Sequence, residues 1–120
     1  MERVEIIAAS PGIPVAARAE FKQLVRQAIE LAAAEPGTLK YDIYFDSDET
    51  MCVFHEVYVN SEAMLAHLDN ARQVLSSLGP LGGGQEVLIL GAPSETLLDA
   101  LTAVRPHVLR HFSGTRDREA

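Results

Sequence analysis

Two segments of alternating apolar and polar residues, placed one after the other near the middle of the chain, constrain the fold more than any other feature. Residues 39–45 read LKYDIYF and residues 51–59 read MCVFHEVYV, and the first segment shows the two-residue period of a β-strand most clearly. The DSDET segment between them is rich in side chains that hydrogen-bond their own backbone in turns. The pattern predicts an antiparallel hairpin.

Segments with the period of an amphipathic helix flank this hairpin on both sides. Apolar residues recur at helical spacing across residues 15–34, and a Pro-Gly pair ends the pattern. A second helix is expected over residues 61–78, with Asn60 or Ser61 as its N-cap. The GPLGGG segment should end this helix, because glycine and proline interrupt helical backbone.

Further elements are expected toward both ends of the chain. β-Branched and apolar residues predict strands at residues 4–9 and 85–90. Ser94 is placed to cap a third helix that reaches about residue 104. For residues 107–112, a short helical turn and a final strand both fit the pattern.

The order of these elements predicts an α+β fold of the ferredoxin-like type, β-α-β-β-α-β, with an appended C-terminal helix. Residues 1–113 are expected to form one domain, and residues 114–120 a flexible tail of small and charged residues. Helices on one face of an antiparallel sheet leave the other face uncovered. Dimerisation is the simplest way to cover it, so a homodimer is expected.

Composition excludes several classes of partner. The 120-residue chain has a net charge of −7 and no concentrated basic stripe, so nucleic acid is not expected to bind. No apolar segment approaches the length needed to span a membrane, and the N-terminus does not resemble a signal peptide. These features predict a cytoplasmic protein without membrane contact.

No metal site is expected from the histidine positions. His107 and His111 are four residues apart, which would suit a metal on a helix, but no third ligand is evident nearby. His55 and Glu56 are adjacent in a predicted strand, so their side chains should lie on opposite faces. The glycine-rich segment before residue 85 precedes a strand, whereas phosphate-binding loops open a helix.

Both faces of the second hairpin strand are mixed in polarity, and one of them combines a glutamate and a tyrosine with apolar neighbours. That face carries Cys52, Phe54, Glu56 and Tyr58, which fits either a partly wet cavity or interface, or a solvent-facing edge. Cys52 is the single cysteine of the chain and is expected to be a buried free thiol.

The sequence EPGTLKYDIY, followed by FHEVYVNSEAMLAHL, resembles the antibiotic biosynthesis monooxygenase family, which includes bacterial quinol monooxygenases. The resemblance rests on the order and spacing of eight residues: Glu35, Pro36, Gly37, Tyr41, Glu56, Tyr58, Ala66 and His67. It implies a dimeric α/β barrel with an apolar pocket between sheet and helices. It also implies oxidation of small quinols or polycyclic phenols by molecular oxygen without metal, flavin or other cofactor, although many relatives have no known activity.

The chain departs from some relatives in ways that narrow this expectation. The sites of haem-degrading relatives look built around an Asn, a Trp and a His. This chain has no tryptophan and places His67 where that Trp would fall. The same helix has no later histidine. These departures argue against haem degradation and weaken an assignment to polyketide substrates held by a tryptophan.

Cofactor-free oxygenation requires a base, donors that stabilise the substrate anion, and a dry pocket. His67 is the best candidate base because its ordinary pKa is near neutral, and Glu56 could orient it or adjust its pKa. The candidate substrate-binding residues are Tyr41, Tyr58, Phe54 and Met64, of which the tyrosines could bond a substrate oxygen or stack on an aromatic ring.

Each of these residues also has a purely structural interpretation. His67 could be a core histidine bonded to a backbone carbonyl or to Glu56, and Glu56 an ion-pair or interface residue. The alternative function is then a non-oxygenating barrel that binds or isomerises a small apolar metabolite. A pocket joining His67, Tyr41 and Tyr58 to solvent would favour the oxygenase, and a pocket filled by Met64, Phe54 and Leu68 the alternative.

Overall fold

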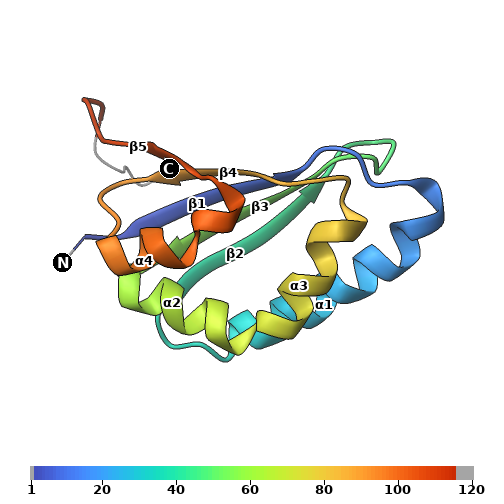
Figure 1. Cartoon of the computed structure of the whole chain (residues 1–120), viewed down its shortest axis with the longest axis horizontal. Helices are drawn as coiled ribbons and strands as arrows, with labels where there is room; N and C mark the ends of the chain where they lie inside the picture. Colours follow the sequence, from blue (N-terminus) through green and yellow to red (C-terminus); the bar gives the residue numbers. More distant parts are fainter. Residues whose placement is uncertain (1, 116–120) are drawn as a thin grey trace.

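The computed structural model describes residues 2–115 and contains one five-stranded sheet with four α-helices (Figure 1). In chain order the elements are β1 (Val4–Ser10), α1 (Arg18–Ala33), β2 (Thr38–Phe45), β3 (Cys52–Tyr58), α2 (Ser61–Asn70), α3 (Arg72–Leu81), β4 (Glu86–Leu90), α4 (Glu95–Ala100) and β5 (His107–Leu109). Short 3-10 turns precede α1 and follow α4. None of these helices has the length and apolar character needed to cross a membrane.

The strands lie in the order β2-β3-β1-β4-β5. β1 pairs antiparallel with both β3 and β4, and β2 forms the expected hairpin with β3. This arrangement confirms the ferredoxin-like fold. Because β3 lies between β2 and β1, its face with Glu56 and Tyr58 is not a solvent-facing edge.

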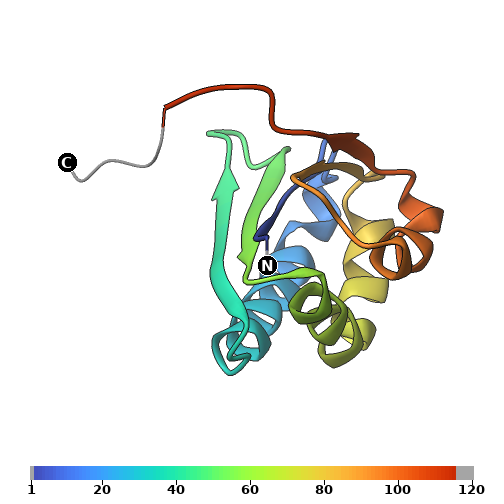
Figure 2. The ribbon, with the colours of Figure 1, turned by 90° about the vertical axis from the view of Figure 1, so that its left-hand side faces the viewer.

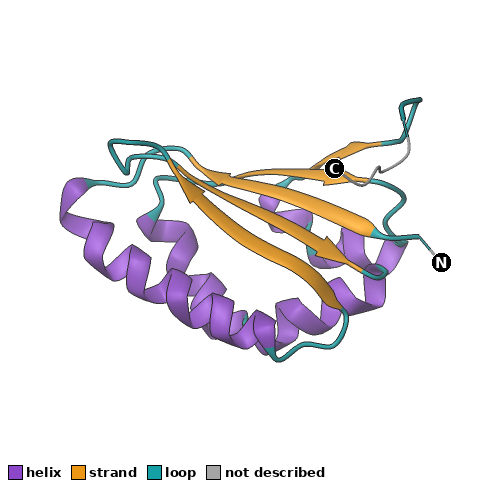
Figure 3. Ribbon diagram, turned by 180° about the vertical axis from the view of Figure 1, so that it is seen from behind, coloured by secondary structure: helices purple, strands orange, loops and turns teal. Residues whose placement is uncertain are grey.

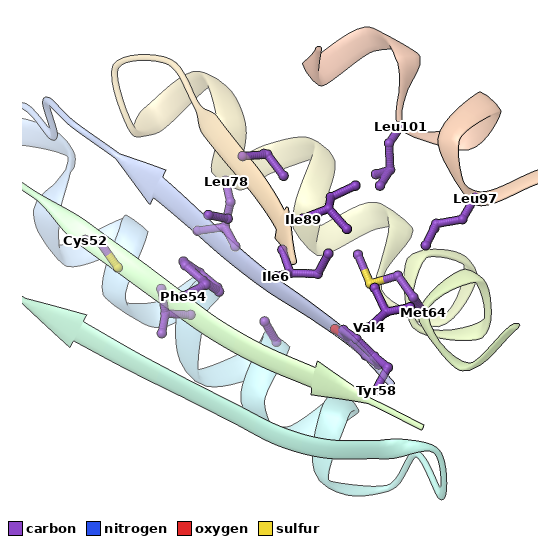
Figure 4. Close-up of a cluster of buried hydrophobic side chains, with 14 of the residues drawn as sticks. Val4, Ile6, Cys52, Phe54, Tyr58, Met64, Leu78, Ile89, Leu97 and Leu101 are labelled. Carbon is purple, nitrogen blue, oxygen red and sulfur yellow. The ribbon is translucent and has the colours of Figure 1, made fainter. Parts of the chain in front are cut away.

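All four helices cover one face of the sheet and leave the other face open (Figure 3). Side chains from alternate positions of β1, β3 and β4 point from the sheet toward the helices and form the core (Figure 4). Phe21 of α1, Ile6 of β1 and Ile89 of β4 are almost completely buried there. The hydrophobic free energy of this layer holds the helices on the sheet.

Cys52 lies in this core as a free thiol, as the sequence predicts. Burial raises the pKa of its thiol to about 12. The group is therefore protonated at neutral pH.

The second predicted helix is two helices, which corrects the single element expected over residues 61–78. Ala71 separates α2 from α3 with a non-helical backbone, although its N–H still bonds His67 O and its C=O still accepts from Leu75. The backbone hydrogen bonds therefore continue from α2 into α3 although the helical backbone is interrupted. Ala71 is buried at the junction. α3 extends to Leu81 before the glycine segment ends it.

The sequence pattern left open whether residues 107–112 form a helical turn or a final strand, and the structure shows a strand. Residues 107–109 form β5, a short strand that pairs parallel with β4 at the edge of the sheet. The appended helix is the short α4, continued by a 3-10 turn at residues 102–104. Of the predicted flexible tail, residues 116–120 lie outside the described residues.

Candidate functional site

The site begins where α1 ends and the chain turns into β2. The helical backbone stops after Ala33, and Pro36 cannot continue it, which leaves Glu35 in the connection below α2. A Cβ atom added to Gly37 would lie 2.5 Å from the Cβ of Ala63, so only glycine lets α2 approach this closely. Ala63 is one helical turn before His67, and this close approach brings His67 to Glu35.

We expect Gly37→Ala to lower the free energy of unfolding by about 1–3 kcal/mol, because the added methyl group overpacks the contact with α2. Urea denaturation measures the change. Gly79→Ala is the matched control, since a Cβ at that position of α3 meets no atom within 4 Å. An equal loss in both variants would contradict the close approach at Gly37.

Glu35 accepts hydrogen bonds from three side chains, two on α2 and one on β2. His67 Nδ1 lies 2.8 Å from Oε1, Thr38 Oγ1 lies 2.7 Å from Oε1, and Asn70 Nδ2 lies 2.8 Å from Oε2. Burial alone would raise the pKa of Glu35, but the bonds from Asn70 and Thr38 and the nearby His67 outweigh it and lower that pKa. Glu35 is therefore an ionised acceptor at neutral pH.

His67 is held by this carboxylate in one tautomer. An ionised carboxylate only accepts, so the proton of the neutral ring is on Nδ1, and Nε2 keeps its lone pair. Burial lowers the pKa of His67, and the charge and hydrogen bond of Glu35 offset part of that decrease. The ring is only 1% exposed, and its Nε2 makes no hydrogen bond within residues 2–115. The arrangement is that of an oriented general base.

Two tyrosine rings pack against His67 from the sheet. The ring centroids of Tyr41 and Tyr58 lie 4.9 and 5.6 Å from that of His67, and Tyr41 also meets Phe54 edge to face. The hydroxyl of Tyr41 is buried without a hydrogen-bond partner in the described part of the chain. Burial, followed by nearby carboxylates, raises the pKa of both tyrosines, so both stay neutral.

Glu56 forms no hydrogen bond or ion pair with His67, contrary to the sequence interpretation. Its Oε1 accepts from the hydroxyl of Tyr58 at 2.5 Å, two residues along the same face of β3. Burial raises the pKa of Glu56 to about 7, although the bond from Tyr58 opposes the shift. Glu56 can therefore hold a proton at neutral pH while His67 remains free to accept one.

The raised pKa of Glu56 predicts a pH-dependent contribution to stability. The folded state binds the proton more tightly than the unfolded state, so this contribution is full below the ordinary pKa and is lost as pH rises through about 7. Between about pH 5 and about pH 8, the free energy of unfolding should fall by roughly 2–3 kcal/mol more in the unmodified protein than in Glu56→Gln.

Urea titrations of both proteins at each pH measure this difference. The lowered pKa of His67 acts in the opposite direction, since stability from a depressed histidine is lost as pH falls, but it is common to both proteins and cancels. Equal pH slopes would mean that Glu56 is ionised in the folded protein.

A cavity of about 540 Å³ lies between the sheet and the helices, next to these groups. This volume suits a small organic ligand. Its wall is mostly apolar and includes the polar residues Glu56, His67, Arg72, Ser76 and Gln85. The apolar lining comes from β1, β4, α2, α3 and the segment after β4: Ile6, Ala8, Met64, Leu68, Leu75, Val87, Ala100, Leu101, Ala103 and Val104.

The cavity contains half of the predicted site residues. His67, Glu56 and Met64 line it. Tyr41 and Tyr58, which pack against the His67 ring, and Phe54, which packs against Tyr41, do not. The cavity therefore matches neither the arrangement expected for the oxygenase nor the one expected for the alternative in full. The cavity reaches His67 without the tyrosines, and Met64 and Leu68 form its wall without filling it.

The sequence interpretation gave no role to two residues of the site. Glu35 was named only as part of the family pattern, and its contact with His67 joins positions 32 residues apart. Arg72 lies at the exposed mouth of the cavity and pairs with Asp69. The sequence feature that could have identified Arg72 is its position at helical spacing from Leu68 and Leu75, which places a charge beside the apolar side of the helix.

Comparison with known proteins gives one family and one fold. Residues 6–73 match the model of the family described as antibiotic biosynthesis monooxygenase. No curated protein matches the sequence.

Several solved structures share the fold. MupZ from Pseudomonas fluorescens is 22% identical, with a TM-score of 0.79 over 98% of this chain and 96% of its own. Rv0793 from Mycobacterium tuberculosis is 25% identical, with a TM-score of 0.68 over 78% and 98%. SnoaB from Streptomyces nogalater, described as a cofactor-independent oxygenase, is 18% identical, with a TM-score of 0.65 over 78% and 95%.

Proposed function

Because the chain belongs to the antibiotic biosynthesis monooxygenase family, we propose that it is a cofactor-independent monooxygenase. Its substrate is a small quinol or polycyclic phenol, oxidised by molecular oxygen. The observation that carries the proposal is His67, held by the ionised Glu35 at the wall of the cavity with Nε2 unbonded. The description of SnoaB as a cofactor-independent oxygenase supports it.

The reaction begins with a proton transfer that His67 can accept. Nε2 removes the phenolic proton, and the resulting anion gives an electron to oxygen more readily than the neutral phenol does. Recombination of the two radicals forms a carbon–oxygen bond. Loss of water then leaves a quinone product, so one oxygen atom enters the substrate and the other becomes water.

The surroundings of His67 suit the later steps. The apolar wall formed by residues such as Met64 and Leu68 keeps water away from the radical pair. Glu56 lines the same cavity and can supply a proton to the departing oxygen, because its pKa is about 7. His67 and Glu56 thus serve as base and acid.

The same pair favours a second candidate, the isomerisation of a small apolar metabolite. A base at His67 and an acid at Glu56 can move a proton from one atom of a ligand to another without oxygen. This reaction requires no electron transfer.

Oxygen uptake by the metal-stripped protein distinguishes the two candidates. A panel of hydroquinones and anthrones should consume one molecule of oxygen for each quinone formed, above the rate of autoxidation. Uptake that disappears on metal removal and returns on metal addition would contradict a cofactor-independent reaction. No uptake, together with catalysed exchange of carbon-bound hydrogen for deuterium in an enolisable ketone, would support isomerisation instead.

We also propose that the protein is a homodimer that packs through the open face of the sheet. That face carries the apolar side chains of Ile7, Val53 and Leu88, which residues 2–115 cover with no helix (Figure 3). A second copy would remove this area from water.

A further inference from the structure

The chain after β5 leaves the body of the molecule as an extended arm, residues 110–115 (Figure 2). Every residue of the arm is exposed, and the Phe112 side chain is 98% exposed. Removal of a phenylalanine ring from water lowers the free energy, so the exposed Phe112 ring is available to pack on a partner surface.

The arm departs on the side of the sheet that the helices do not cover (Figures 1 and 3). It passes beyond its own open face without packing on it, since residues 110–115 stay exposed. The arm and its own open face therefore make no packing contact with each other. The arm is placed to contact a second molecule that packs on the open face of the sheet.

The open face itself has the chemistry to receive such an arm. The strand register places three groups of side chains on it: apolar Ile7, Val53 and Leu88, the aromatic Tyr44, and the charged Glu5, Lys40, Asp42 and Glu86, while Val57 on the same side is already buried. Tyr44 is 56% exposed on β2. A phenylalanine that reaches this strand would find an aromatic and apolar partner.

Charges on the arm and the face are complementary. The C-terminal segment at residues 105–115 contains two arginines and two histidines but no acidic residue. On the face, Asp42 and Glu86 are exposed and form no ion pair among the described residues. Arg110 of the arm likewise forms none.

We infer that residues 110–115 cross to a second copy of this chain and pack Phe112 on the β2 side of that copy's open face, near Tyr44, with Arg110 beside Asp42. This inference rests on the sheet-to-sheet homodimer proposed above. One chain supplies both the arm and its receptor, so a two-fold axis satisfies both arms at once. Each copy then holds the other by a sheet contact and by an arm.

The dissociation constant of the dimer tests the arm. A chain that ends at Leu109 and a Phe112→Ala variant should each dissociate at least about tenfold more readily than the full chain in sedimentation equilibrium. A chain that ends at Thr115 keeps the arm and is the control for the truncation, and Ser113→Ala is the control for the substitution. Circular dichroism checks that every variant remains folded.

A photocrosslinking residue at position 112 tests where the arm lies. In a mixture of ¹⁴N- and ¹⁵N-labelled chains, crosslinks should join light to heavy chains and map to peptides of β2 or β3. Crosslinks within one chain, or unchanged dissociation in both arm variants, would overturn the arm exchange and leave the dimer standing. A full chain that stays monomeric would overturn the proposed dimer together with the arm.

Discussion

Replacing His67 with glutamine should reduce kcat/KM for oxygen-dependent quinol oxidation by at least about 100-fold. The glutamine amide can still donate to Glu35 and fill much of the buried space, but it cannot accept a proton from a phenol. The loss should therefore appear in the rate rather than in the fold. An oxygen electrode measures the rate, and circular dichroism measures the fold.

His107→Gln is the matched control, because that histidine lies on β5, away from the Glu35 contact. It should retain full activity. Unchanged uptake in His67→Gln would remove His67 as the base while leaving the oxygenase in place. Substrates that are already ionised at the assay pH should be less sensitive to the substitution, which provides an internal check on the proton transfer.

Replacing Glu35 with glutamine should reduce kcat/KM for the same oxidation by about 100-fold, because the His67 ring is no longer held in the tautomer that accepts a proton. A glutamine amide can donate to Nδ1, which would place the ring proton on Nε2 and leave no lone pair toward the cavity. Loss of the carboxylate also removes the charge that opposes the effect of burial on the His67 pKa. The ring then becomes a weaker base.

The pH profile separates this role from a loss of folding. Activity needs neutral His67 and, for the proton return, protonated Glu56, so kcat/KM should rise through the lowered pKa of His67 and fall above about pH 7. In Glu35→Gln the acidic limb should move to lower pH, since the pKa of His67 falls further. Glu62→Gln, at an exposed position in the first turn of α2, should leave both limbs in place. An unmoved acidic limb in Glu35→Gln would contradict the contact.

Most of the fold follows from periodicity, and the exceptions have physical causes. The hairpin and the first helix carry strong two-residue and helical repeats. The break at Ala71 has no sequence signal, because alanine is the best helix former and the break depends on packing against other elements. β5 has only three residues and exists through its pairing with β4, so its own pattern could not decide between strand and turn.

The site was less predictable than the fold, because it depends on contacts between distant segments. His67 could be singled out from its own chemistry. Its partner could not, since the sequence interpretation named Glu56, and the approach of α2 at Gly37 brings Glu35 to His67 instead. The bond between Glu56 and Tyr58 joins residues two apart on one strand face, and the strand repeat alone could have suggested it.

The buried position of Cys52 has a consequence for an enzyme of this kind. Quinones are electrophiles that add to thiolates, and a catalyst that releases them is exposed to arylation by its own product. Cys52 is the single cysteine of the chain, is fully buried, and has a pKa of about 12. If the protein forms a quinone as proposed above, it presents that product with no thiolate, and arylation of its own cysteine is not expected.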